Sequence, residues 1–121
     1  MLSSPLAPSV EPYLVGAGER ASAPDLVTVE VLHVIRAHER ARRIDHARAA
    51  TAARALHELP LVRYPALPVA ERVWDLRHNF SAYDAAYVAL AEALGTSLVT
   101  TDARLARAVR DHSRARAVLL S

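Results

Sequence analysis

Two aspartates in this 121-residue chain have a spacing that suits metal-dependent chemistry. The stretch SAYDAAYVALAEALGTSLVTTDARLA, residues 81–106, places Asp84 near its start and Asp102 near its end. The apolar segment between them predicts a helix that ends at Gly95 and a strand at 97–100 that runs back beside it. About ten helical residues span on the order of 15 Å, and the returning strand covers roughly 17 to 20 Å. We therefore expect both carboxylates at the carboxyl edge of a sheet, where open α/β sheets bind ligands.

A third acid is expected at the same edge. Glu30 is the only charged residue in the run Val27 to Val31, which is otherwise β-branched, and a short strand at 20–24 precedes this helix. Each acid also has a purely structural interpretation. Asp84 suits the dipole of its helix, Asp102 suits an N-cap, and Glu30 could point to solvent.

The convergence of three acids nevertheless favours a bound cation. Two like charges about 5 Å apart cost roughly 3 kcal/mol at an effective dielectric of 20, so something should offset their repulsion. Mg²⁺ is held by a few carboxylates together with waters and substrate phosphates. Zinc fits less well, because the chain has no cysteine and no histidine pair at metal-ligand spacing near these acids. A carboxylate-bound Mg²⁺ suits phosphodiester hydrolysis, which indicates a hydrolase acting on a nucleic acid backbone.

Short strands that alternate with helices predict an α/β fold with a mostly parallel sheet. Asp25, Asp45 and Ser81 are each expected to cap a helix, and residues 61–64 have the content of a buried strand. The strands are expected at 20–24, 61–64, 97–100 and 116–120, and the helices at 26–40, 46–59, 68–79, 82–94 and 102–111. We expect one domain over residues 1–121, with a weakly structured N-terminal segment at 1–19 that offers at most a short helix or strand around Tyr13 to Val15.

Composition narrows the possible classes of function. A content of 52% hydrophobic residues is enough for a packed core, and the chain has no run long and apolar enough to cross a membrane. The absence of cysteine excludes disulfides, thiolate metal sites and cysteine nucleophiles, and is typical of a reducing compartment such as the cytoplasm. No segment resembles an export signal. All fifteen basic residues are arginines, which suit phosphate partners, but a genomic bias towards arginine and alanine is the favoured explanation of the composition.

The stretch NFSAYDAAYVALAEALGTSLVTTDARLARA, together with PDLVTVEVLHVIR upstream, closely resembles the VapC-type toxins of the PIN-domain family. This resemblance implies a three-layer α/β/α fold and the toxin of a type II toxin-antitoxin system. It also implies an endoribonuclease that depends on Mg²⁺ or Mn²⁺, a cognate VapB-type antitoxin as partner, and a homodimer. The acidic positions of the family correspond to Glu30, Asp84 and Asp102, and Thr100 matches the hydroxyl residue of the strand-end motif.

The chain departs from the family at its N-terminus. Family members begin with a buried strand that ends in a further metal-binding aspartate and lies in the middle of the sheet, whereas this chain begins MLSSPLAPSVEP. One interpretation is a shortened form whose start codon is placed too far downstream. The alternative is a decayed, catalytically impaired PIN domain that acts only as an antitoxin-binding module. Tyr13 to Val15 could fill part of the gap.

Two further groups of residues have open roles. Arg36 and Arg40, with Arg42 and Arg43, form a cationic run at a helix end, which is either a contact for RNA phosphates or a solvated surface favoured by the helix dipole. Trp74, Leu76 and Phe80 are expected to be core or dimer-contact residues. With only 5% aromatic residues, the chain does not fit a base-stacking RNA-binding surface.

Overall fold

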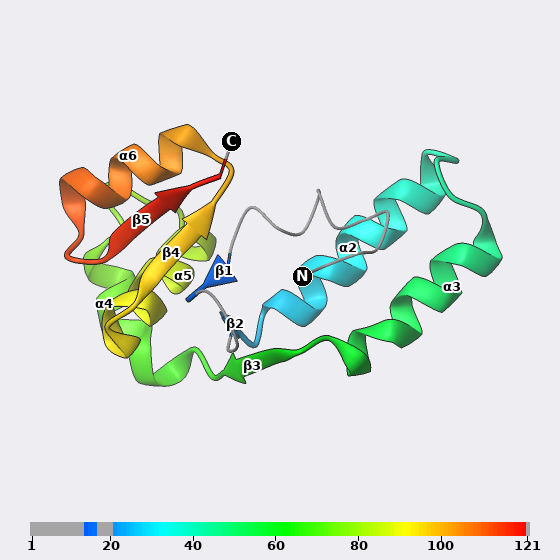
Figure 1. Ribbon diagram of the computed structural model, residues 1–121, viewed down its shortest axis with the longest axis horizontal. Coiled ribbons are helices and arrows are strands. Elements are labelled where there is room, and N and C mark those ends of the chain that lie inside the picture. The colour runs from blue at the N-terminus through cyan, green and yellow to red at the C-terminus, as the bar shows by residue number, and fades with distance from the viewer. Residues whose placement is uncertain (1–13, 17–20, 121) are drawn as a thin grey trace.

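Short strands form one sheet in the order β3-β2-β1-β4-β5 within the part of the chain that the structure describes (Figure 1). The structure is a computed structural model and describes residues 14–16 and 21–120. The strands are β1 (Leu14–Val15), β2 (Ala21–Pro24), β3 (Leu61–Tyr64), β4 (Ser97–Thr100) and β5 (Arg116–Leu119). The α-helices are α2 (Val27–Arg40), α3 (His46–Arg54), α4 (Ala70–Asp75), α5 (Ala82–Leu94) and α6 (Ala103–His112), and two short 3₁₀ helices lie at Ala55–Glu58 and Leu67–Val69.

The predicted α/β fold with a mostly parallel sheet is confirmed. Strand β2 is parallel to β3, and β4 is parallel to β5. The middle strand β1 is antiparallel to both of its neighbours: Val15 lies opposite Ser22 of β2 and Leu98 of β4. Val15 is fully buried, and the Gly16 amide donates to the Ser97 carbonyl at 2.7 Å. The two residues of β1 thus form backbone hydrogen bonds with β2 on one side and β4 on the other. Without β1, the facing edges of β2 and β4 would have unpaired backbone groups.

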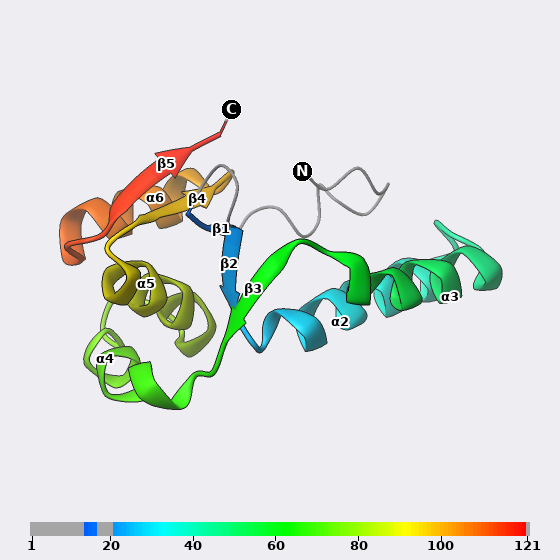
Figure 2. The same ribbon diagram turned by 60° about the horizontal axis from the view of Figure 1, so that its bottom comes forward.

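Helix α5 is the central helix of the fold. All seven residues from Ala85 to Ala91 are buried, so this helix is covered on every side. It packs against β1, β2 and β4 as well as against α4, while α6 packs against β4 and β5 (Figure 2). All four residues of β2 and the last three of β4 are buried. Because side chains alternate between the two faces of a strand, both faces of these strands are covered.

Helices α2 and α3 form an antiparallel pair that extends away from the sheet (Figures 1 and 2). Val27, Val31 and Ile35 recur at helical spacing and are buried, and α3 contributes the buried Ala49. The first turn of α2 follows directly from the carboxyl end of β2, so this connection positions Glu30 beside the sheet edge.

The helix-terminal predictions are correct at three sites. The Asp45 side chain accepts a hydrogen bond from the Arg48 amide at 2.8 Å, and the Ser81 hydroxyl accepts one from the Asp84 amide at 3.1 Å. Gly95 ends α5 with φ of 64°, in the left-handed region that favours glycine.

Three expectations about elements are wrong. Asp25 does not cap α2: Leu26 is the N-cap residue, without a side-chain bond, and the Asp25 amide instead donates to the Tyr64 carbonyl at 2.7 Å, so it extends the β2–β3 pairing. Because Leu26 is the N-cap and α2 begins at Val27, Glu30 lies in the first turn of α2. Strand β3 is only partly buried, because it pairs with β2 alone and forms a sheet edge. The helices expected at 46–59 and 68–79 are shorter: α3 ends at Arg54, where a 3₁₀ helix follows, and α4 ends at Asp75.

The expected N-terminal segment at 1–19 lies outside the described residues except for 14–16, and Tyr13 is among those outside. Leu14–Val15 form a strand in the gap between β2 and β4, as expected for this part of the segment. Within the described ranges, the longest apolar helices fall short of what a membrane crossing requires.

Candidate active site

Asp84 and Asp102 lie together at one edge of the sheet. Asp84 is in the first turn of α5, and Asp102 follows β4 and is the N-cap of α6. Both line one hollow of about 360 Å³, together with Asn79, Phe80, Ser81, Arg104, Leu105 and Ala108. Burial raises the pKa of the Asp84 carboxyl, the charge of Asp102 raises it further, and a hydrogen bond with the Ser81 side chain partly offsets both effects. The structure therefore brings the two aspartates within electrostatic reach of each other, as predicted.

Backbone amides and a buried hydroxyl fix Asp102. Its Oδ1 accepts hydrogen bonds from the amides of Arg104 at 2.9 Å and Leu105 at 3.2 Å. Its own amide donates to Oγ1 of Thr100 at 3.0 Å, and Thr100 is fully buried. The structural interpretation of Asp102 as an N-cap is thus confirmed. The two capping hydrogen bonds are to Oδ1, so Oδ2 can accept a hydrogen bond or bind a cation while the N-cap of α6 stays intact.

Glu30 is close enough to Asp84 for their charges to interact, but it borders a different hollow. That hollow is lined by Leu26, Val29, Glu30, His33, Val34 and Tyr83. Burial raises the pKa of the Glu30 carboxyl most, a hydrogen bond from Tyr87 lowers it, and the charge of Asp84 raises it. The Tyr87 hydroxyl donates to Oε1 of Glu30 at 2.5 Å. The three acids thus form a series of neighbours, in which Asp84 interacts with both Glu30 and Asp102.

The donor chemistry of the aspartate pair fits a hard divalent cation. Mg²⁺ prefers oxygen ligands and is commonly held by one or two carboxylates plus waters, which matches Asp84 and Asp102. A cation between them would remove the repulsion that raises the pKa of Asp84. Among residues 14–16 and 21–120, no three histidine, aspartate or glutamate side chains are grouped closely enough to hold a metal on their own. Direct ligation by all three acids therefore stays a prediction.

Sequence reasoning missed Tyr87 and the neighbours of the aspartate pair. Tyr87 is three residues after Asp84, and positions three apart lie on the same face of a helix, so its spacing was an available signal. Asn79 and Arg104 line the hollow of the aspartates because a turn before α5 and the start of α6 meet there. Arg104 is exposed and lines the same hollow as the two aspartates.

The other candidate residues have mixed outcomes. Arg36 and Arg40 are exposed on α2, and their contact with RNA stays a prediction. Leu76 and Phe80 are core residues as expected. Trp74 is 64% exposed and lies against the Arg77 guanidinium, 4.3 Å from the ring centre. A dimer contact at Trp74 remains a prediction.

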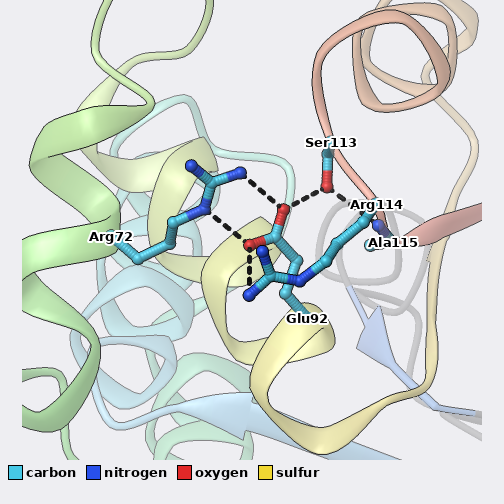
Figure 3. A network of polar contacts seen from close by, with 5 residues as sticks. All are labelled: Arg72, Glu92, Ser113, Arg114 and Ala115. Atoms are coloured by element: carbon cyan, nitrogen blue, oxygen red, sulfur yellow. Dashed lines mark hydrogen bonds and ion pairs between the residues drawn. The ribbon is translucent and has the colours of Figure 1, made fainter.

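A second polar cluster, centred on Glu92, lies near the other end of α5 (Figure 3). The Glu92 side chain is 1% exposed, and Arg72 contacts both of its oxygens, at 2.7 and 3.0 Å. The Ser113 hydroxyl donates to Oε2 at 2.5 Å, and Arg114 lies 3.8 Å from Oε1. Burial alone would raise the pKa of Glu92, but the hydrogen bonds from Arg72 and Ser113 and the charges of Arg72 and Arg114 together lower it. This cluster joins α4, α5 and the turn before β5, so its role is structural.

The fold and the acidic pair define an α/β domain with a candidate cation site at the carboxyl edge of its sheet. The sequence of residues 2–111 matches the PIN domain family, and the chain belongs to that family. It is similar to the VapC ribonuclease Mb0985 of Mycobacterium bovis, with 44% identity over 89 residues that cover 74% of this chain and 70% of the relative. Ribonuclease VapC12 of Mycobacterium tuberculosis is 40% identical over 108 residues, which cover 88% of this chain and 81% of the relative. Ribonuclease VapC1 of Mycobacterium tuberculosis is 45% identical over 89 residues, which cover 73% of this chain and 67% of the relative. The family predicted from the sequence is confirmed.

Proposed function

We propose that the chain is the toxin of a type II toxin-antitoxin system and acts as a Mg²⁺-dependent endoribonuclease, with Mn²⁺ as an alternative cation. The observation that carries this proposal is the pairing of Asp84 and Asp102 in one hollow, where the charge of one raises the pKa of the other. Membership of the PIN domain family and the similarity to proteins named VapC ribonucleases support the choice of RNA as substrate.

Each residue of the site has a defined task in this proposal. Asp84 and Asp102 hold the cation through carboxylate oxygens, and Glu30 adds negative charge next to Asp84. Thr100 and the first amides of α6 fix Asp102. When bound, Mg²⁺ lowers the pKa of a water for attack on the phosphodiester and neutralises charge on the phosphate. Arg104 borders the same hollow, where its guanidinium is suited to a phosphate oxygen of the RNA.

The proposed partners follow from the same relatives. A VapB-type antitoxin is the expected inhibitor, since the relatives carry VapC names, and an acidic site favours an antitoxin segment with a basic side chain. A homodimer and a cytoplasmic location are part of the same proposal.

The direct test is cleavage of a single-stranded RNA by the purified chain. We expect cleavage with Mg²⁺ and none with EDTA. Asp84→Asn should lower the rate of cleavage at least about a hundredfold, because it removes the charge of a cation ligand while the side chain keeps nearly the same shape. Asp111→Asn is the matched control, since Asp111 is exposed near the end of α6, and it should cleave like the unaltered chain. Cleavage that persists in EDTA, or in Asp84→Asn, would contradict the proposal.

A second candidate function is an antitoxin-binding module without catalysis. The observation that favours it is the position of Glu30, which borders a different hollow from the aspartate pair. This candidate predicts that the chain binds a VapB-type antitoxin in a pull-down with the same affinity in Asp102→Asn, while RNA stays intact at every Mg²⁺ concentration.

A further inference from the structure

The hydrogen bond between Tyr87 and Glu30 links the two helices that carry the acidic residues. Tyr87 belongs to α5 and Glu30 to α2, and they are 57 residues apart in the sequence. The Tyr87 hydroxyl donates to Oε1 of Glu30 at 2.5 Å. Hydrogen bonds from a hydroxyl to an ionised carboxylate are short and roughly twice as strong as neutral ones. This contact therefore fixes the Glu30 carboxylate relative to α5.

The setting of Tyr87 makes the contact rigid. Its side chain is 2% exposed, and the neighbouring residues of α5 from Ala85 to Ala91 are buried as well. A tyrosine has only two side-chain torsions, and packing on all sides leaves its hydroxyl little freedom. Tyr87 is also one turn after Asp84, on the same face of α5. The helix that carries Asp84 therefore also holds the Glu30 carboxylate through a hydrogen bond.

We propose that Tyr87 is a positioning residue of the cation site, and that its hydroxyl holds Glu30 next to Asp84 in the orientation that favours cation binding. This inference rests on the proposed function and extends it to a residue that bears no charge itself. The hydroxyl acts through Glu30, as outer hydrogen-bond partners orient metal-binding groups elsewhere.

The test compares Tyr87→Phe with Tyr64→Phe in the full chain. Each substitution removes one hydroxyl and keeps the ring, and Tyr64 is a partly buried residue of β3. Three quantities are measured: the Kd for Mn²⁺ without RNA, from the paramagnetic resonance of free Mn²⁺; the Mn²⁺ concentration for half-maximal cleavage; and the Tm. We expect Tyr87→Phe to raise the Kd and the half-maximal concentration about tenfold each, with cleavage recovering at saturating Mn²⁺. Tyr64→Phe should leave both unchanged.

A double substitution separates positioning from packing. If the hydroxyl acts through Glu30, then adding Tyr87→Phe to Glu30→Gln should raise the Kd for Mn²⁺ by less than about twofold, because the two changes affect one interaction. An unchanged Kd in Tyr87→Phe with a lowered Tm would overturn the inference and leave Tyr87 a core residue, as would a full tenfold effect in the Glu30→Gln background.

The outcomes also separate this inference from the proposed function. If Asp84→Asn loses Mn²⁺ binding and Tyr87→Phe does not, the result supports the cation site and contradicts the positioning role of Tyr87. If the unaltered chain and Asp84→Asn bind Mn²⁺ with the same Kd, the result contradicts both the cation site and the positioning role of Tyr87.

Discussion

Thr100 is fully buried, and its hydroxyl oxygen accepts a hydrogen bond from the backbone amide of Asp102, a proposed cation ligand. Thr100→Val has nearly the same shape but leaves that amide without its acceptor. We expect it to lower the free energy of unfolding by about 1 to 3 kcal/mol, measured by urea denaturation, and to reduce RNA cleavage because Asp102 loses its orientation. Thr100→Ser keeps the oxygen and should restore most of the cleavage. Equal cleavage by the valine and serine variants would contradict this role.

The sequence was most informative about individual residues at this edge. Asp84 and Asp102 could be placed together because a helix and a returning strand of known rise connect them. The position of Glu30 was less predictable, since the start of α2 was misplaced when Asp25 was taken as its cap. The bond from Tyr87 to Glu30 joins residues 57 positions apart, and no local pattern specifies such a contact.

At the scale of the elements, the Glu92 cluster determines how α4, α5 and the turn before β5 meet. Its hydrogen bonds and charges hold the pKa of Glu92 below its usual value, so the folded state favours the ionised form. The resulting stability is fully present above the usual pKa of Glu92 in the unfolded chain and is lost as the pH falls through the lower pKa of the folded state.

Glu92→Gln tests this cluster. We expect it to reduce the free energy of unfolding by about 1 to 3 kcal/mol at pH 7, because the partly exposed Arg72 loses the charge of its buried partner. The difference from the unaltered chain should shrink in acid, below the usual pKa of a glutamate. Glu71→Gln is the control, since Glu71 is exposed in the first turn of α4. A difference that stays constant from pH 7 down to pH 3 would argue against ionisation of Glu92 as the cause.

Elements with strong local signals were predicted well, whereas the strand in the middle of the sheet was expected near Val15 without its direction. Ser81, Gly95 and Asp45 signal helix ends through local hydrogen bonds and backbone conformation, so both ends of α5 and the start of α3 are predicted correctly. Strand β1 has two residues and runs antiparallel to its neighbours. A segment that short has no periodicity, and its place in the sheet depends on the unpaired edges of β2 and β4.

At the scale of the whole molecule, the distribution of arginines bears on RNA binding. Arg36 and Arg40 are exposed on the part of α2 that extends away from the sheet. If both contact RNA phosphates, replacing both with glutamine should weaken the binding of single-stranded RNA about equally for different sequences. The slope of log K against log salt should become shallower by roughly 0.7 per lost contact. The measurement is fluorescence anisotropy at several salt concentrations with EDTA present. An unchanged slope would assign these arginines to the solvated surface.

The central claim is that Asp84 and Asp102 share one divalent cation. Anomalous diffraction from crystals of the full chain grown or soaked with Mn²⁺ tests it most directly, because the signal locates the metal itself. We predict one strong peak between the two side chains, with an oxygen of each carboxylate at about 2.0 to 2.3 Å, and no such peak in crystals of Asp84→Asn. Strong Mn²⁺ density elsewhere on the protein, with the space between Asp84 and Asp102 empty, would contradict the account.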